Sequence, residues 1–155
     1  MPTKTCCVTG HRDIPVEQME RVEAELRALI HRAINAGYGT FISGFARGVD
    51  RIFARLVLVL QAENPIRLEA AIPYAGQLKS RNLEFQSLLA RCSAIDVIYE
   101  EYAPDCFFAR NQYMVEKSDA VIAVYDGRQR GGTYQTIRYA REAGRKIAFV
   151  HVTPP

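Results

Sequence analysis

The chain has 155 residues and a formal net charge of +3, with 48% hydrophobic and 24% charged residues. This composition is typical of a globular protein and excludes a disordered, collagen-like or coiled-coil chain. The length predicts a single domain over residues 1–155. A charge of +3 is too small to indicate nucleic-acid binding by itself.

Targeting and metal signals are missing from the sequence. The most apolar stretch, Ile52 to Leu60, contains Arg55 and is far shorter than the roughly 20 residues of a membrane span. The opening residues, MPTKTCCVTG, lack the apolar core of a signal peptide, so we expect a cytoplasmic protein with no membrane partner. The cysteines show neither a CxxC pair nor zinc-site spacing, which predicts reduced thiols and no metal site; they are Cys6, Cys7, Cys92 and Cys106.

Apolar runs and amphipathic helical patterns alternate along the whole chain. Strands are predicted over Lys4–Thr9, Tyr38–Ile42, Leu68–Pro73, Ala94–Tyr99, Ala120–Tyr125 and Lys146–Val150. Helices are predicted from Pro15 to Gly37, from Val49 to Leu60, and over Lys79–Arg91, Asp105–Lys117 and Thr133–Ala143. The alternation predicts an α/β fold, a single doubly wound three-layer domain with a mostly parallel sheet of about six strands. Ligands of such folds bind beyond the carboxyl ends of the strands, so functional residues are expected just after strands.

Two loops after strands combine glycine with arginine. The first holds Gly10, His11 and Arg12, and the second holds Ser43, Gly44, Arg47, Gly48 and Asp50. Backbone N–H groups of such turns, together with a helix N-terminus, can hold a phosphate. The alternative is that glycine and serine simply form the turns, that His11 anchors its loop, and that Asp50 complements a helix dipole.

A polar residue interrupts the predicted helix over Asp105–Lys117. Asn111 falls on the apolar face, between Phe107 and Met114, and is predicted to point inward, where it either holds a neighbouring loop or contacts a ligand. Arg110 flanks that face and is the better candidate for a ligand contact. Sixteen of the twenty basic residues are arginine, which suits phosphate binding but is also typical of a GC-rich genome.

A third glycine-bearing turn follows the predicted strand over Ala120–Tyr125. It contains Asp126, and Gly131, Gly132 and Thr133 then open the last long helix. Unhindered N–H donors and a hydroxyl at a helix start favour phosphate binding, although a flexible loop with a threonine cap is the alternative. Because all three turns fall where this fold places its cleft, we favour a binding site.

These motifs together resemble the SMF/DprA–LOG (SLOG) superfamily of Rossmann-like proteins. Ser43–Asp50 looks like the DprA signature SGxAxGID, and Phe108–Asn111 looks like its later FPxRNR. The segment Arg110–Thr136 resembles the LOG pattern of RK, SDAFIALPGG and GTxxE. With the opening TGHR, the similarity covers nearly the whole chain and points to the small YpsA/YoqJ-like branch.

The resemblance implies a nucleotide or its phosphate in the cleft. The superfamily contains single-stranded-DNA binders, phosphoribohydrolases acting on nucleoside monophosphates, and proposed sensors of nucleotide-derived ligands, and its members commonly form dimers. In the LOG pattern the last glutamate of GTxxE is catalytic, but this sequence has Thr136 there, which cannot act as the base. The resemblance therefore favours binding without turnover, with no required cofactor.

Four interpretations remain open at this point. The favoured one is a cytosolic domain that binds a nucleotide or nucleotide derivative, with Arg12, Arg47 or Arg110 as counter-charges. The second is an N-glycosidase in which Arg110 orients the phosphate and Asp126 or Asp50 stabilises the developing cation. The third is a DprA-like single-stranded-DNA binder that uses the same arginines. An interaction scaffold with an empty cleft is a further alternative.

Overall fold

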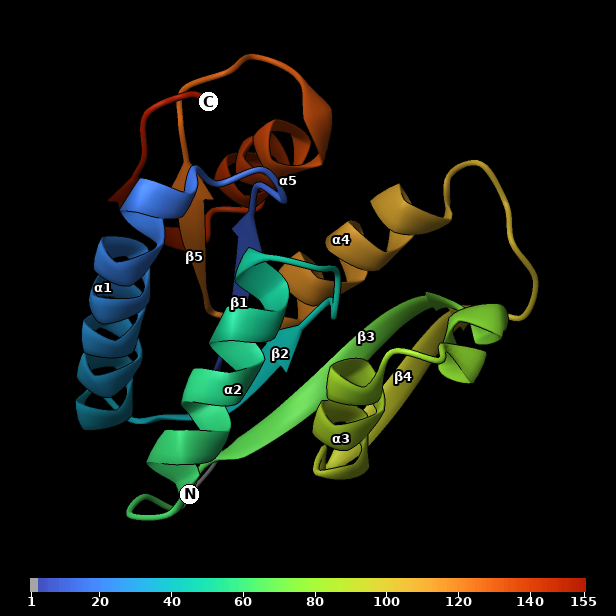
Figure 1. Ribbon diagram of the computed structural model, residues 1–155, viewed down its shortest axis with the longest axis horizontal. Coiled ribbons are helices and arrows are strands. Elements are labelled where there is room, and N and C mark those ends of the chain that lie inside the picture. Colours follow the sequence, from blue (N-terminus) through green and yellow to red (C-terminus); the bar gives the residue numbers. More distant parts are fainter. Residues whose placement is uncertain (1–2) are drawn as a thin grey trace.

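The computed structural model describes residues 3–155, and its elements alternate as predicted (Figure 1). The strands are β1 (Lys4–Gly10), β2 (Tyr38–Ser43), β3 (Arg67–Tyr74), β4 (Ala94–Tyr99), β5 (Ala120–Tyr125) and β6 (Lys146–His151). The helices are α1 (Val16–Asn35), α2 (Val49–Gln61), α3 (Leu83–Ala90), α4 (Cys106–Lys117) and α5 (Gly131–Glu142), and a 3₁₀ turn, η1, covers Ala75–Lys79. Every predicted strand is confirmed, to within two residues at either end.

The six strands form one sheet in the order β4-β3-β2-β1-β5-β6, and all neighbouring pairs are parallel. The chain builds outward from β1 to β4 and then returns to the other side of β1 with β5. The strand order therefore reverses between β1 and β5, where Gly10 pairs with Val124 at the carboxyl ends. In this architecture that reversal point is the place where ligands bind.

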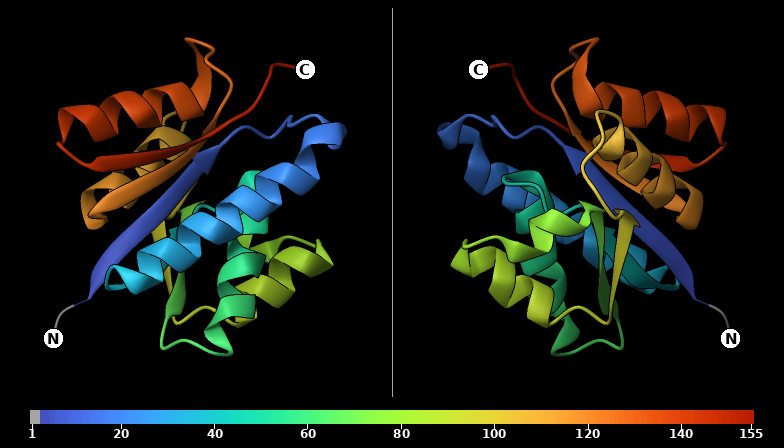
Figure 2. Two further views of the ribbon diagram at one scale, coloured as in Figure 1. Left: turned by 90° about the vertical axis from the view of Figure 1, so that its left-hand side faces the viewer. Right: turned by 90° about the vertical axis from the view of Figure 1, so that its right-hand side faces the viewer.

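Helices cover both faces of the sheet, which confirms the doubly wound three-layer fold. Helices α1, α2 and α3 lie on one face, and α4 and α5 lie on the other (Figure 2). The alternation of side chains along β1 divides the core accordingly, because successive residues of a strand point to opposite faces. Cys6 packs in the cluster under α1 and α2, whereas Cys7 packs with Met114 and Ala140 under α4 and α5.

One predicted helix is wrong at its start. This helix was expected to begin at Lys79. In the structure Lys79 is the last residue of η1, and α3 begins only at Leu83. The cause is a cap: the side-chain oxygen of Asn82 accepts the Phe85 N–H at 2.8 Å, which fixes the first turn of α3. Lys79 therefore belongs to η1, on the carboxyl side of the sheet, and not to α3.

No helix within residues 3–155 is both long and apolar enough to cross a membrane. The same part of the chain contains no group of three or more His, Cys, Asp or Glu side chains placed to hold a metal ion. The four cysteines are free thiols, and burial raises the pKa of Cys7 to about 12.

Candidate functional site

A cavity of about 390 Å³ opens where the strand order reverses, and we call it the switch-point cavity. Its walls come from the loop after β1, from α2 and α4, and from the start of α5. It brings together most of the residues that the sequence singled out: Gly10, His11, Arg12, Asp50, Arg110, Asn111, Gly131, Gly132 and Thr133. The remaining candidates do not line this cavity; they are Ser43, Gly44, Arg47, Gly48 and Asp126.

The start of α5 forms one wall of this cavity. The residue before the helix, Arg130, provides no side-chain cap for the first-turn N–H groups. Gly131 and Gly132 are exposed, and Thr133 lines the cavity beside them. The first turn of a helix carries the equivalent of about half a positive charge. This wall is therefore suited to an anion, and Arg130, which also lines the cavity, adds a full charge.

Ser43 and Gly44, which open the second glycine-bearing loop, do not line the cavity as a ligand-binding role would require. Ser43 is fully buried, and its hydroxyl donates to the Asp50 carbonyl at 2.8 Å and accepts the Phe45 N–H at 3.2 Å. Neither Ser43 nor Gly44 lines the cavity, and Gly48 lies directly before α2. These residues shape the loop from within because their polar groups already have partners in the protein.

Arg110 is the side chain that requires Gly44. A Cβ at residue 44 would lie 2.8 Å from Arg110 Nη1 and 3.0 Å from an Asp50 carboxylate oxygen. Arg110 is only 5% exposed, and its Nη1 donates to the Gly44 carbonyl at 2.6 Å. The guanidinium thus links α4 to the loop after β2 across the cavity floor.

The roles expected of Arg110 and Asn111 are therefore reversed. Asn111 was expected to point inward and Arg110 to flank the buried face, but Arg110 is buried and Asn111 is half-buried. The Asn111 side-chain oxygen accepts from Arg110 Nε at 2.9 Å. The long arginine side chain reaches a carbonyl on another element, a contact that helical spacing alone does not encode.

Asp50 is a buried carboxylate rather than a simple complement to the dipole of α2. It is 8% exposed, and its Oδ2 accepts the Ala46 N–H at 3.2 Å. Burial raises its pKa, while the charges of Arg110 and Arg12 and the Ala46 hydrogen bond act in the opposite direction. Asp50 and Arg110 thus act as compensating charges beneath the cavity.

Asp126 belongs to a network at the rim of the cavity rather than to its lining. Arg128 donates to both Asp126 oxygens at distances between 2.6 and 3.1 Å, and reaches Asp13 at 3.2 Å. The Asp126 side chain is 2% exposed. Burial alone would raise the pKa of Asp126. The hydrogen bonds from Arg128 and the charge interaction with His11 together outweigh burial, so the pKa is lowered. The carboxylate is therefore ionised, and the positive charge of Arg128 already compensates its negative charge.

His11 joins this network to the cavity. Its Nε2 lies 3.2 Å from the backbone N of Asp126 and 3.1 Å from Asp126 Oδ1. Burial lowers the pKa of His11 despite the neighbouring carboxylate, so the ring is neutral at pH 7 and Nε2 accepts the Asp126 N–H. A protonated ring would donate to Oδ1 instead. His11 anchors the first loop to β5 and at the same time lines the switch-point cavity.

The position of the LOG glutamate carries no acid–base group. The Thr136 hydroxyl donates to the Gly132 carbonyl at 2.7 Å, one turn earlier in α5, and the residue is 4% exposed. Of the two carboxylates considered for an N-glycosidase, only Asp50 lines the cavity.

A second cavity, of about 360 Å³, adjoins the first and is called here the basic cavity. Arg47, which was expected at the first cavity, lines this one, together with Arg51, Lys79 and Phe85. The two cavities share four lining residues, Arg12, Ala46, Phe107 and Arg110. Sequence reasoning missed Arg51, Lys79 and Phe107 because their approach depends on where η1 and α4 pack.

Comparisons with known proteins agree on the fold. The family model described as the YspA SLOG family matches residues 6–152. UPF0398 proteins of Bacillus thuringiensis (strain Al Hakam) and Bacillus cereus (strain Q1) are 27% identical over an alignment of 157 positions, which covers 91% of this chain and 84% of theirs.

Two solved structures share the architecture. DNA processing protein A from Helicobacter pylori, described for its single-stranded DNA binding mode, superposes with a TM-score of 0.71 at 20% identity; the match covers 95% of this chain but only 65% of that one. A protein designated TM1055 gives a TM-score of 0.60 at 17% identity, covering 93% of this chain and 72% of its own. At these sequence identities, the similarity shows a shared fold and nothing more.

Proposed function

This chain belongs to the YspA SLOG family, and from that premise we propose that its switch-point cavity binds a nucleotide or nucleotide derivative through a phosphate group. The observation that carries the proposal is the start of α5, which has no side-chain cap and lines the cavity with Gly131, Gly132 and Thr133. Phosphate is the anion that such a helix start binds well.

The charges around that helix start support the same ligand. Arg12 and Arg130 are exposed arginines on the cavity wall, and Arg110 contributes its charge from the floor. Arg110 makes its hydrogen bonds within the protein, so Arg12 and Arg130 are the proposed direct counter-charges. Asp50, in the first turn of α2, also lines the cavity and offers an acceptor for a sugar hydroxyl.

A thermal-shift screen tests the proposal. Nucleoside mono-, di- and triphosphates, NAD, ADP-ribose and cyclic dinucleotides would be added to purified protein. A ligand at about a hundred times its dissociation constant should stabilise the fold by about 2.7 kcal/mol. Arg130→Ala should weaken binding about tenfold through loss of a charge-assisted contact, whereas Arg27→Ala on α1, away from the cavity, serves as the matched control. No shift with any compound would overturn the proposal.

Single-stranded DNA is a second candidate ligand, which the likeness in fold to the Helicobacter pylori DNA-binding protein favours. Binding to a phosphate backbone should weaken steeply with salt, by about 0.7 log units per tenfold salt for each phosphate contacted. Failure to retard a labelled oligonucleotide at low salt would remove this candidate.

We further propose binding without turnover and without a required cofactor, because Thr136 replaces the LOG glutamate. Release of ribose 5-phosphate from a nucleoside monophosphate would overturn the proposal of binding without turnover. The homodimer expected from the family also remains a prediction, which light scattering on the purified protein would test.

A further inference from the structure

We propose that the basic cavity is a second phosphate subsite, so that the preferred ligand carries two phosphates on opposite sides of one nucleoside. This inference rests on the proposed function, because the first phosphate is the one assigned to the start of α5. The required chemistry is found in a nucleoside 3′,5′-bisphosphate and in a stretch of single-stranded nucleic acid.

The charge of the basic cavity is the first argument. Its lining includes Arg12, Arg47, Arg51, Lys79 and Arg110, and it includes no aspartate or glutamate. The buried Asp50 compensates the charge of Arg110, and none of the other four side chains takes part in an ion pair with a carboxylate within residues 3–155. Like charges held around one hollow repel each other, and a bound anion would offset that repulsion.

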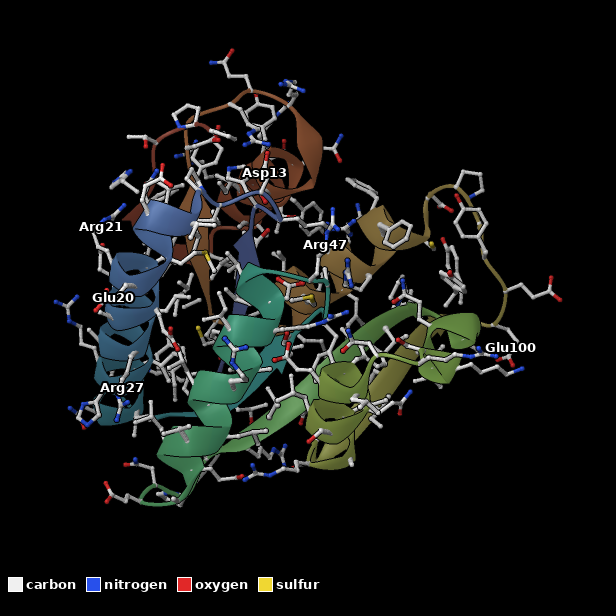
Figure 3. All side chains as sticks on the ribbon, in the orientation of Figure 1. Asp13, Glu20, Arg21, Arg27, Arg47 and Glu100 are labelled. Atoms are coloured by element: carbon white, nitrogen blue, oxygen red, sulfur yellow. The ribbon has the colours of Figure 1, made fainter. Side chains whose placement is uncertain are left out.

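The arrangement of these cations is the second argument. Arg51 is held in place, since its Nε donates to the Phe45 carbonyl at 3.3 Å and its guanidinium lies 5.6 Å from the centre of the Phe85 ring. Arg47 and Lys79 are exposed and come from loops after two different strands, β2 and β3 (Figure 3 labels Arg47). One fixed guanidinium and two adjustable cations are suited to a phosphate with several oxygen acceptors.

The connection between the cavities defines the ligand class. Their shared wall contains Arg12, Phe107 and Arg110. Volumes of about 360 and 390 Å³ are each in the range of a small-molecule site, about 300–1,000 Å³, and larger than one phosphate needs. Each cavity therefore has room for more than a phosphate, and a ligand with one phosphate in each cavity has to cross the shared wall. Phe107 offers the part of the ligand between the phosphates an apolar surface at the boundary, as expected for a nucleoside.

Calorimetric titration with matched pairs of compounds tests this inference. The probes are the four nucleoside 5′-monophosphates and the corresponding 3′,5′-bisphosphates. We expect at least one bisphosphate to bind about tenfold or more tightly than its monophosphate, because it gains charge-assisted contacts. The double variant Arg47→Ala/Lys79→Ala should lose that preference. The matched control is Arg27→Ala/Arg81→Ala, which removes the same charge from exposed positions outside both cavities and should retain it.

A further arm distinguishes the two sources of this chemistry. The probe is a 5′-phosphorylated dodecathymidylate. A single strand is identified as the source if this oligonucleotide binds more tightly than any bisphosphate and if the double variant reduces the slope of log binding constant against log salt by about 0.7. A bisphosphate that binds more tightly than the oligonucleotide would identify a free nucleotide.

Each opposing outcome has a separate meaning. Equal binding of mono- and bisphosphates overturns the second subsite and leaves the proposed function standing. A bisphosphate preference that persists in Arg47→Ala/Lys79→Ala overturns the assignment to the basic cavity. Absence of binding by every probe, the oligonucleotide included, overturns the second subsite, whereas the proposed function is overturned only if the thermal-shift screen also gives no shift with any compound.

Discussion

Arginines at the carboxyl edge of the sheet occur in two opposite electrostatic settings. Arg128 donates to two carboxylates, Asp126 and Asp13, beside a buried histidine. In the adjoining basic cavity, Arg47 and Arg51 line the wall together with other cations and with no aspartate or glutamate. The two settings share the same end of the fold and the same residue type.

The difference shows how to separate structural from ligand-directed arginines in one site. A guanidinium whose donors are satisfied by protein acceptors, such as Arg128 or Arg110, holds elements together, and its removal leaves a buried partner unsatisfied. A cation clustered with like charges costs stability until an anion arrives. Stability and binding should therefore respond in opposite ways to substitutions in the two settings.

The largest effect is expected for Arg110→Ala, which should lower the free energy of unfolding by about 2–4 kcal/mol. It removes the donor to the Gly44 carbonyl and leaves Asp50 buried without its compensating charge. Urea unfolding measures the loss. Arg130→Ala, at an exposed position on the same cavity, should change stability by less than about 0.5 kcal/mol. An unchanged midpoint for Arg110→Ala would contradict the structural role.

Arg128→Ala should cost about 1–2 kcal/mol, because Asp126 is buried and loses the guanidinium that contacts both of its oxygens. The matched control is Arg55→Ala, which breaks a pair whose two side chains are 42% and 43% exposed and should cost at most about 1 kcal/mol. Equal losses in the two variants would show that the network is no stronger than an ordinary surface pair.

The His11 ring should make stability depend on pH in a defined direction. Burial lowers the pKa of His11 in the folded state, so below about 6.5 the unfolded chain takes up a proton that the folded chain resists. Stability from this group is present above that pH and is lost as the pH falls through the folded-state pKa. The stability gap between wild type and His11→Gln should therefore narrow from about pH 7.5 to about pH 5.5 in urea titrations. A gap that widens would mean a raised pKa.

The smallest effect is expected for Arg47→Ala/Lys79→Ala without ligand. Removing two like charges should leave the free energy of unfolding within about 0.5 kcal/mol of wild type, with any change toward higher stability. Raising the salt concentration should shrink the difference, because exposed charges are screened. A clear destabilisation at low salt would mean that these side chains have protein partners after all.

The strands and the edge at which they end follow from local sequence signals, whereas the strand order, and with it the reversal point, was not predicted. Each buried strand is short and ends at a turn residue, as Gly10 and Ser43 show, and each helix carries an apolar stripe at helical spacing. Parallel order then places the strand ends on one edge. For these reasons the edge of the sheet that carries the switch-point cavity could be predicted before the strand order was known.

The roles of individual side chains could not be predicted in the same way. Gly10 was interpreted as a turn that admits an anion, but a Cβ there would lie 2.6 Å from Val49, so packing of α2 against β1 already demands glycine. Arg110 finds its acceptor 66 residues earlier in the chain. Contacts of this kind depend on the packing of distant elements, which spacing within one helix does not describe.

The N-terminal strand β1 is central in the sheet, and this has a consequence for synthesis on the ribosome. Its partner on one side, β2, follows within 40 residues, but its partner on the other side, β5, is translated only at Ala120–Tyr125. At about 5–20 residues per second, one edge of β1 waits for several seconds without a hydrogen-bonding partner. During that interval the buried run of Cys6, Cys7 and Val8 forms an open strand edge. The nascent chain should thus be most prone to aggregation just before β5 closes the sheet.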